Sequence, residues 1–130
     1  MNGAGFGLSV LAVSVGAAIG AVLRWLLAAR FNPLSTAVPL GTLAANLIGG
    51  YAIGLALGWL GQHPEMPPQV RMFVVTGMLG GLTTFSTFSA EVVTHLQTGR
   101  LGPALLLAVT HVAGSLALTA LGLATARALS

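Results

Sequence analysis

The chain has 130 residues, of which 55% are hydrophobic and only 5% charged, with a net charge of +3 and a mean hydropathy of +0.93. This composition is far from that of a soluble domain and predicts an integral membrane protein. Cysteine is absent, which excludes disulfides and thiolate chemistry, and three scattered histidines do not make a convincing metal site.

The charged residues divide the chain into four uncharged stretches, residues 1–23, 31–64, 72–90 and 101–126. Each stretch supplies the ~20 residues that a spanning helix needs. We therefore expect one all-α membrane domain over residues 1–130, with helices at about 8–29, 39–60, 70–95 and 104–126. Four packed helices leave little room for a hydrated pore, so a transport function predicts an oligomer, most simply a homodimer.

The first expected helix contains Gly16 and Gly20 in GxxxG spacing, which permits close approach of another helix. Near its end, Arg24 lies beside Trp25. A cation next to an aromatic residue is typical of an anchor at the membrane boundary, and a role in an ion vestibule is the alternative.

The second expected helix is rich in small residues and contains Asn46, the only amide well inside any expected span. Its side chain carries two N–H donors and a carbonyl acceptor in a place without water. Asn46 is therefore either a polar contact between helices or part of a functional site.

The third expected helix should be interrupted between Gly77 and Thr84, because Gly80 and Gly81 have poor helix propensity. A break there frees backbone carbonyls, which must be satisfied inside the protein or by an ion. Carbonyl oxygens are hard ligands, suited to an alkali or alkaline-earth cation. The alternative is that the glycines only allow close packing.

Hydroxyl and aromatic side chains follow the expected break. Phe85 and Phe88 are three residues apart, which places both rings on one face of a helix. Ring edges carry positive partial charge, and hydroxyl groups donate hydrogen bonds, so both favour an anion. Alternatively, the hydroxyls bond to carbonyls of their own helix. The hydroxyl residues are Thr83, Thr84, Ser86 and Thr87.

On the fourth expected helix, His111, Ser115 and Thr119 recur every four residues, so they share one side that should face protein or water. Glu91, the only carboxylate near a span, is interpreted as an end-of-helix or vestibule residue. Taken together, the break, the hydroxyls, the paired rings, Asn46 and the positive net charge predict a small-anion path with a structural cation.

The arginines are divided almost equally between the two expected ends of the molecule. Arg71 and Arg127 belong to the end with the termini, and Arg24, Arg30 and Arg100 to the other. This near balance favours insertion in both orientations and an antiparallel dimer.

The string GGLTTFSTF, from Gly80 to Phe88, closely resembles the signature of the Fluc (CrcB) fluoride channels of microbes. GTLAANLIGGYAIG, from Gly41 to Gly54, is similar to the second motif of that family, and VGAAIGAVLRW, from Val15 to Trp25, to its first. The resemblance covers nearly the whole chain in the expected order.

The resemblance implies a fluoride-specific channel rather than an enzyme, which exports fluoride passively from the cytoplasm through the cell inner membrane. It further implies a dual-topology homodimer in membrane lipid, with two antiparallel pores, one structural sodium ion (Na+) at the dimer centre and no nucleic-acid partner. Gly80 and Thr83 would supply backbone carbonyls to sodium. The residues expected along the fluoride pathway are Asn46, Phe85, Phe88, Ser86, Thr87, Thr84, Ser115 and Arg24.

Within that pathway, Phe85 and Phe88 would present ring edges to fluoride, Asn46 would donate its amide N–H, and hydroxyls would continue the track. His111 matches no role in the family pattern. Two other functions are compatible with the size of the chain: a dual-topology multidrug and proton antiporter, and a structural subunit of a membrane complex. The antiporter would need a carboxylate deep in a helix, and the first two expected helices have none.

Overall fold

The computed structural model describes residues 2–130, and every regular element within them is helical. The elements are α1 (Gly3–Phe31), η1 (Asn32–Leu34), α2 (Leu40–Gln62), α3 (Pro68–Arg71), η2 (Met72–Leu79), α4 (Gly80–Leu82), α5 (Phe85–Gln97) and α6 (Leu101–Ala128). The prediction of an all-α fold is confirmed.

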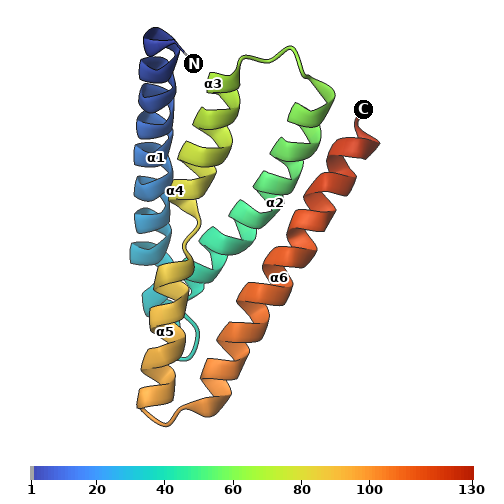
Figure 1. The fold of residues 1–130 in the computed structure, drawn as a ribbon. Helices are drawn as coiled ribbons and strands as arrows, with labels where there is room; N and C mark the ends of the chain where they lie inside the picture. Colours follow the sequence, from blue (N-terminus) through green and yellow to red (C-terminus); the bar gives the residue numbers. More distant parts are fainter. Residues whose placement is uncertain (1) are drawn as a thin grey trace.

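Four helical segments of the described residues are long and apolar enough to cross a membrane. They are Gly3–Leu34, Leu40–Gln62, Pro68–Gln97 and Leu101–Ala128. Both termini lie at the same end as the connection between α2 and α3, and the other two connections lie at the opposite end (Figure 1). The protein is thus a multi-pass membrane protein.

The third span is composite and broken. After the short helix α3, the segment η2 is wound as a π-helix, α4 adds one more turn, and α5 begins at Phe85. Between α4 and α5, Thr83 and Thr84 are extended, with φ/ψ of −84°/153° and −150°/114°. The break therefore falls within the predicted interval, but Gly80 and Gly81 themselves are helical, which corrects the expectation that they form the break.

Gly81 has a different role from the one expected, because it allows two helix backbones to pack closely. A Cβ on Gly81 would lie 2.6 Å from the Ala17 carbonyl oxygen, and a Cβ on Gly20 would collide with the Met78 carbonyl. α1 therefore packs directly on η2 and α4, as its GxxxG predicts.

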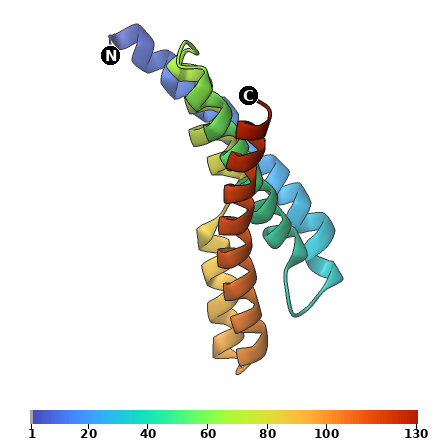
Figure 2. The same cartoon turned by 90° about the vertical axis from the view of Figure 1, so that its right-hand side faces the viewer.

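The second close pair is α2 with α6, which run side by side in Figure 1, whereas α5 lies along the first half of α6 in Figure 2. A Cβ on Gly54 would collide with the Thr119 carbonyl, and one on Gly122 would collide with the Tyr51 carbonyl. Glycines on both helices thus bring the two backbones together, leaving α5 to close one side of the interior.

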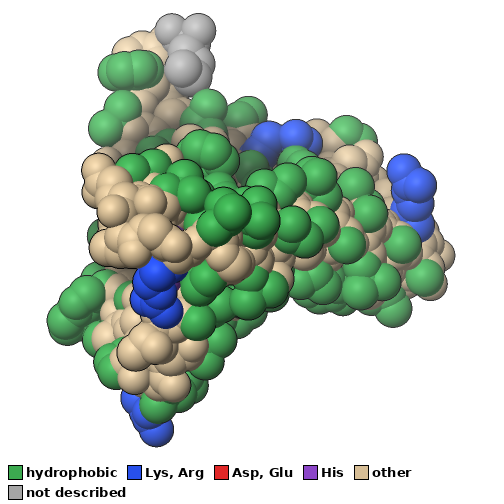
Figure 3. Space-filling view, turned by 90° about the horizontal axis from the view of Figure 1, so that it is seen from below, with side chains coloured by type: hydrophobic (Ala, Val, Ile, Leu, Met, Phe, Trp, Pro, Cys, Tyr) green, Lys and Arg blue, Asp and Glu red, His purple; other side chains and the backbone are tan. Residues whose placement is uncertain are grey.

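The outer surface is mostly apolar. Seen from below, hydrophobic side chains cover most of the molecule, and basic side chains form a few isolated patches (Figure 3). Large side chains such as Trp25 and Leu116 are 64% and 68% exposed. A surface of this kind suits lipid or another membrane-embedded chain.

Candidate functional site

Asn46, in the second turn of α2, joins the break to α6 through its side-chain amide. Its Oδ1 accepts from the Thr84 backbone N–H at 2.7 Å, and its Nδ2 donates to the Thr84 carbonyl at 3.0 Å. The same Nδ2 lies 3.0 Å from Nδ1 of His111. The Thr84 N–H has no helical acceptor, so the Asn46 oxygen satisfies a donor that the break would otherwise leave unpaired.

The contact with Asn46 determines the hydrogen-bonding role of His111. An amide nitrogen can only donate, so Nδ1 accepts and the imidazole is neutral, with its proton on Nε2. The side chain is 3% exposed and stacks on Phe88, with ring centroids 4.6 Å apart. Among the described residues, nothing accepts from Nε2. His111 therefore holds a buried N–H donor free beside the Phe88 ring.

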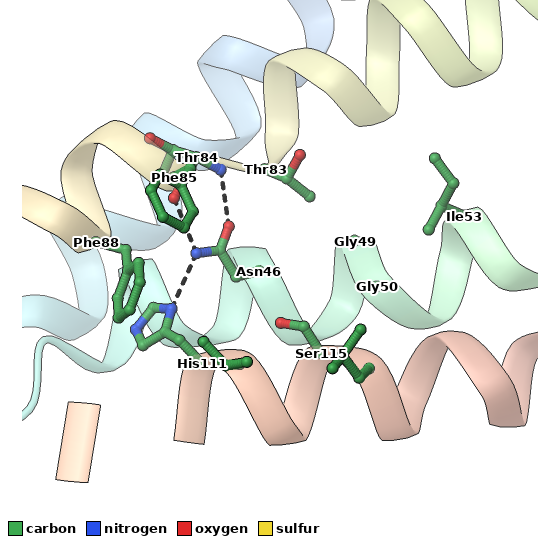
Figure 4. A pocket seen from close by; sticks show the side chains of 12 residues that line it. Asn46, Gly49, Gly50, Ile53, Thr83, Thr84, Phe85, Phe88, His111 and Ser115 are labelled. Atoms are coloured by element: carbon green, nitrogen blue, oxygen red, sulfur yellow. Dashed lines mark hydrogen bonds between the residues drawn. The ribbon is translucent and has the colours of Figure 1, made fainter. Parts of the chain in front are cut away.

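A cavity of about 340 Å³ lies between α2, the break and α6. Asn46 and His111 stand at one end of it, and Ser115 lies further along α6, as Figure 4 shows. The Phe85 and Phe88 rings meet edge to face, with centroids 5.4 Å apart and planes at 70°. Phe85 is 76% exposed and Phe88 only 7%, so the pair runs from the surface into the interior.

Hydroxyl groups cluster where α5 begins. Thr84 Oγ1 accepts from the Thr87 backbone N–H at 3.1 Å, which caps α5, and donates to Thr87 Oγ1 at 3.1 Å. Ser86 Oγ lies 3.3 Å from the same Thr84 oxygen. In contrast, Thr83 Oγ1 donates to the Leu79 carbonyl of its own helix. Three of the four hydroxyls thus form a connected group, and Thr83 is back-bonded.

The break also frees backbone carbonyls. The Thr84 N–H binds Asn46 instead of the Gly80 carbonyl, and the Thr87 N–H binds the Thr84 hydroxyl instead of the Thr83 carbonyl. Gly80 and Thr83 therefore lose the partners that a continuous helix would provide. Within residues 2–130, no group of three or more His, Cys, Asp or Glu residues could hold a metal ion.

Arg24, on α1, contacts the backbone of the third span. Its Nε donates to the Gly81 carbonyl at 3.0 Å, and Arg24 does not line the cavity. Because the break removes the helical partner of Gly81 as well, the arginine satisfies a third freed carbonyl.

Sequence comparisons identify the family of this chain. A family model described as "CrcB-like protein, Camphor Resistance (CrcB)" matches residues 11–123. The chain belongs to the CrcB family. A relative from Thiobacillus denitrificans is 61% identical over 112 residues, covering 86% of this chain and 90% of the relative. One from Burkholderia ambifaria is 58% identical over 120 residues, covering 92% and 94%. Both relatives are named "Fluoride-specific ion channel FluC".

For this CrcB chain, the structure brings together most of the residues singled out from the sequence. Asn46, Thr83, Thr84, Phe85, Phe88 and Ser115 all line the cavity. Gly80, Ser86, Thr87 and Arg24 do not. Gly80 is the first residue of α4, Ser86 and Thr87 contact Thr84 at the start of α5, and Arg24 bonds to Gly81. The predicted polar side of α6 is confirmed, because His111 contacts Asn46 and the Thr119 hydroxyl donates to the Gly50 carbonyl at 3.0 Å.

A second polar contact in this CrcB chain lies beyond the cavity. Thr42 Oγ1 donates to Glu91 Oε1 at 2.7 Å. Thr42 is one turn before Asn46 on α2, and Glu91 is nearly one turn after Phe88 on α5. The sequence analysis interpreted Glu91 as an end-of-helix or vestibule residue and did not single out Thr42. The spacing of four from Asn46 was the signal that placed Thr42 on the same face.

Proposed function

We propose that this chain is the subunit of a passive, fluoride-specific ion channel that lets fluoride leave the cytoplasm. The observation that carries the proposal is its identity of 57–61% with relatives named as fluoride-specific ion channels, over 86–92% of the chain. In α1 and α2 no carboxylate is present to exchange protons, which argues against the antiporter.

The cavity wall supports this proposal chemically. Fluoride is small and strongly hydrated, so it must exchange water for hydrogen-bond donors as it enters. The edges of the Phe85 and Phe88 rings, the Ser115 hydroxyl and the free Nε2–H of His111 can provide such contacts, and the Thr84 hydroxyl can do so if it releases Thr87. None of these groups carries a full charge that would bind the anion too tightly to release it.

Asn46 lies at the same end of the cavity as His111. Both of its N–H groups are engaged in the structure, one by the Thr84 carbonyl and one by His111. We propose that the N–H facing His111 is the one that turns to fluoride, because the bond to Thr84 maintains the break. Ser86 and Thr87 continue the hydroxyl track, and Arg24 acts at the break through Gly81.

A structural sodium ion fits the freed carbonyls of Gly80 and Thr83. Hard carbonyl oxygens suit an alkali cation, and neither carbonyl keeps its usual helical partner. Two carbonyls are too few for a complete shell, so we propose that a second, antiparallel copy contributes the same pair. The ion would hold the two breaks together and would take no part in conduction.

Fluoride efflux from liposomes tests the proposed function directly. The purified protein is reconstituted into vesicles loaded with fluoride or chloride, and the released anion is followed with a selective electrode. We expect rapid fluoride loss with no chloride loss, and neither from protein-free vesicles. Absence of fluoride loss from a folded, reconstituted protein would overturn the channel assignment.

A further inference from the structure

Asn32 follows the last residue of α1 and caps α2, although α2 begins eight residues later in the sequence. Its Oδ1 accepts from the backbone N–H groups of Gly41 and Thr42, at 2.7 Å and 3.0 Å. The residue that precedes α2 is Pro39, whose side chain makes no capping hydrogen bond. Asn32 therefore satisfies two N–H donors that the first turn of α2 would otherwise leave unpaired.

This cap fixes the orientation of the Asn32 amide. Because Oδ1 must face the two backbone donors, Nδ2 faces the side chain of Thr42, and it donates to Thr42 Oγ1 at 3.3 Å. A hydroxyl has one proton, and an amide nitrogen does not accept it. The Thr42 proton is thus directed away from Asn32, toward Glu91 Oε1 at 2.7 Å.

Thr42 lies on α2 between Asn46 and the α1–α2 loop, and Glu91 on α5 accepts its hydrogen bond. Thr42 is 1% exposed, so its hydroxyl is held in one buried place. Among the described residues, the second Glu91 oxygen, Oε2, is buried without a hydrogen-bond partner. The pair is therefore a polar contact inside the protein and not a solvated surface pair.

We propose that the anion path continues from the cavity past Thr42, and that Asn32 is a positioning residue of this path, which directs the Thr42 hydroxyl proton to the side of Glu91. This inference rests on the proposed function. An anion that passes Thr42 then competes only with Glu91 for the hydrogen bond that the Thr42 hydroxyl donates. If the amide were replaced by an acceptor, a second acceptor on the opposite side of Thr42 would also compete for it.

Asn32→Asp separates this role from capping. The carboxylate still accepts from Gly41 and Thr42 as a good cap, but toward Thr42 Oγ1 it can only accept. We expect fluoride efflux to fall about tenfold, the equivalent of one misdirected hydrogen bond, while the unfolding temperature is unchanged or higher. Ser35→Asp is the matched control, because it adds the same charge on the same loop and keeps an acceptor for the Val38 N–H.

The same substitution in a Thr42→Val background completes the test. Without the hydroxyl, Asn32→Asp should reduce efflux no further, whereas an effect of charge alone would persist. If Thr42→Val passes too little fluoride to compare, the ratio of Asn32→Asp to Ser35→Asp decides. Efflux equal to wild type, an equal loss in Ser35→Asp, or the same loss in both backgrounds would overturn the role of Asn32. A wild-type protein that passes no fluoride would instead overturn the proposed function and this inference with it.

Discussion

Asn46 engages all of its hydrogen-bonding groups at once, and its three partners belong to two other parts of the chain. The amide binds both backbone groups of Thr84 and the ring of His111, so one residue links α2, the break and α6. Connected buried hydrogen bonds of this kind depend on each member. Asn46 is therefore both a structural residue and a donor in the proposed path.

Asn46→Asp tests this double role. The carboxylate would face the Thr84 carbonyl and the His111 Nδ1 lone pair, so two donations are replaced by contacts between acceptors. We expect a loss of about 1–3 kcal/mol in unfolding free energy, together with strongly reduced fluoride efflux. Thermal unfolding and liposome efflux measure the two effects.

Gln62→Glu is the matched control for that substitution, because it makes the same chemical change at an exposed amide that bonds to the Ala126 carbonyl at 3.4 Å. Its effects on unfolding and efflux should be small. If both variants behave alike, the hydrogen bonds of Asn46 contribute to neither property.

At the scale of single residues, the sequence predicted the members of the candidate site better than it predicted their contacts. Asn46 was predicted as a candidate residue because an amide inside a membrane span needs a hydrogen-bond partner. Arg24 was harder to interpret, since its neighbour Trp25 indicates the membrane boundary while its partner, the Gly81 carbonyl, lies 57 residues away. The role of His111 depends on a tautomer that only the contact with Asn46 determines.

At the scale of elements, the break in the third span was predictable, but its exact position was not. Glycine indicated weak helix propensity between Gly77 and Thr84. In the structure Gly81 is needed for close contact with α1, while Thr83 and Thr84 leave the helix because Asn46 binds the extended backbone of Thr84. The π-helical winding of η2 has no evident signal in the sequence.

The packing of α2 against α6 provides a prediction at the same scale. Gly54→Ala adds a methyl group where the Thr119 carbonyl lies, so the two helices must move apart. We expect a loss of about 1–3 kcal/mol in unfolding free energy, typical of overpacking. Thermal unfolding in detergent is the measurement.

Gly61→Ala is the control for that packing, because it lies near the end of the same helix and a Cβ there would meet nothing within 4 Å. It should leave stability unchanged or raise it, since alanine is the better helix former. Equal stability of the two alanine variants would show that the helices can separate at no cost.

At the scale of the whole molecule, the near balance of arginines supports the proposed antiparallel dimer. Adding positive charge to one end should force a single orientation. We expect Gln62→Arg with Glu65→Arg to give inactive protein when expressed alone, and Leu34→Arg with Gln97→Arg, at the opposite end, to do the same. Fluoride efflux from vesicles made with each protein is the measurement.

Co-expression of the two charge variants is the decisive arm of that experiment. It should restore efflux, because oppositely oriented copies become available to each other. Full efflux from either variant alone would contradict the antiparallel arrangement, since one orientation would then suffice.

The break at Thr83 and Thr84 places two helix ends of opposite polarity side by side in the middle of a membrane span. Backbone dipoles give the last turn of α4 a partial negative charge and the first turn of α5 a partial positive charge. The first end attracts a cation to carbonyl oxygens, and the second attracts an anion to N–H groups. A single interruption of one helix thus supplies backbone partial charges of both signs, one for each proposed ion.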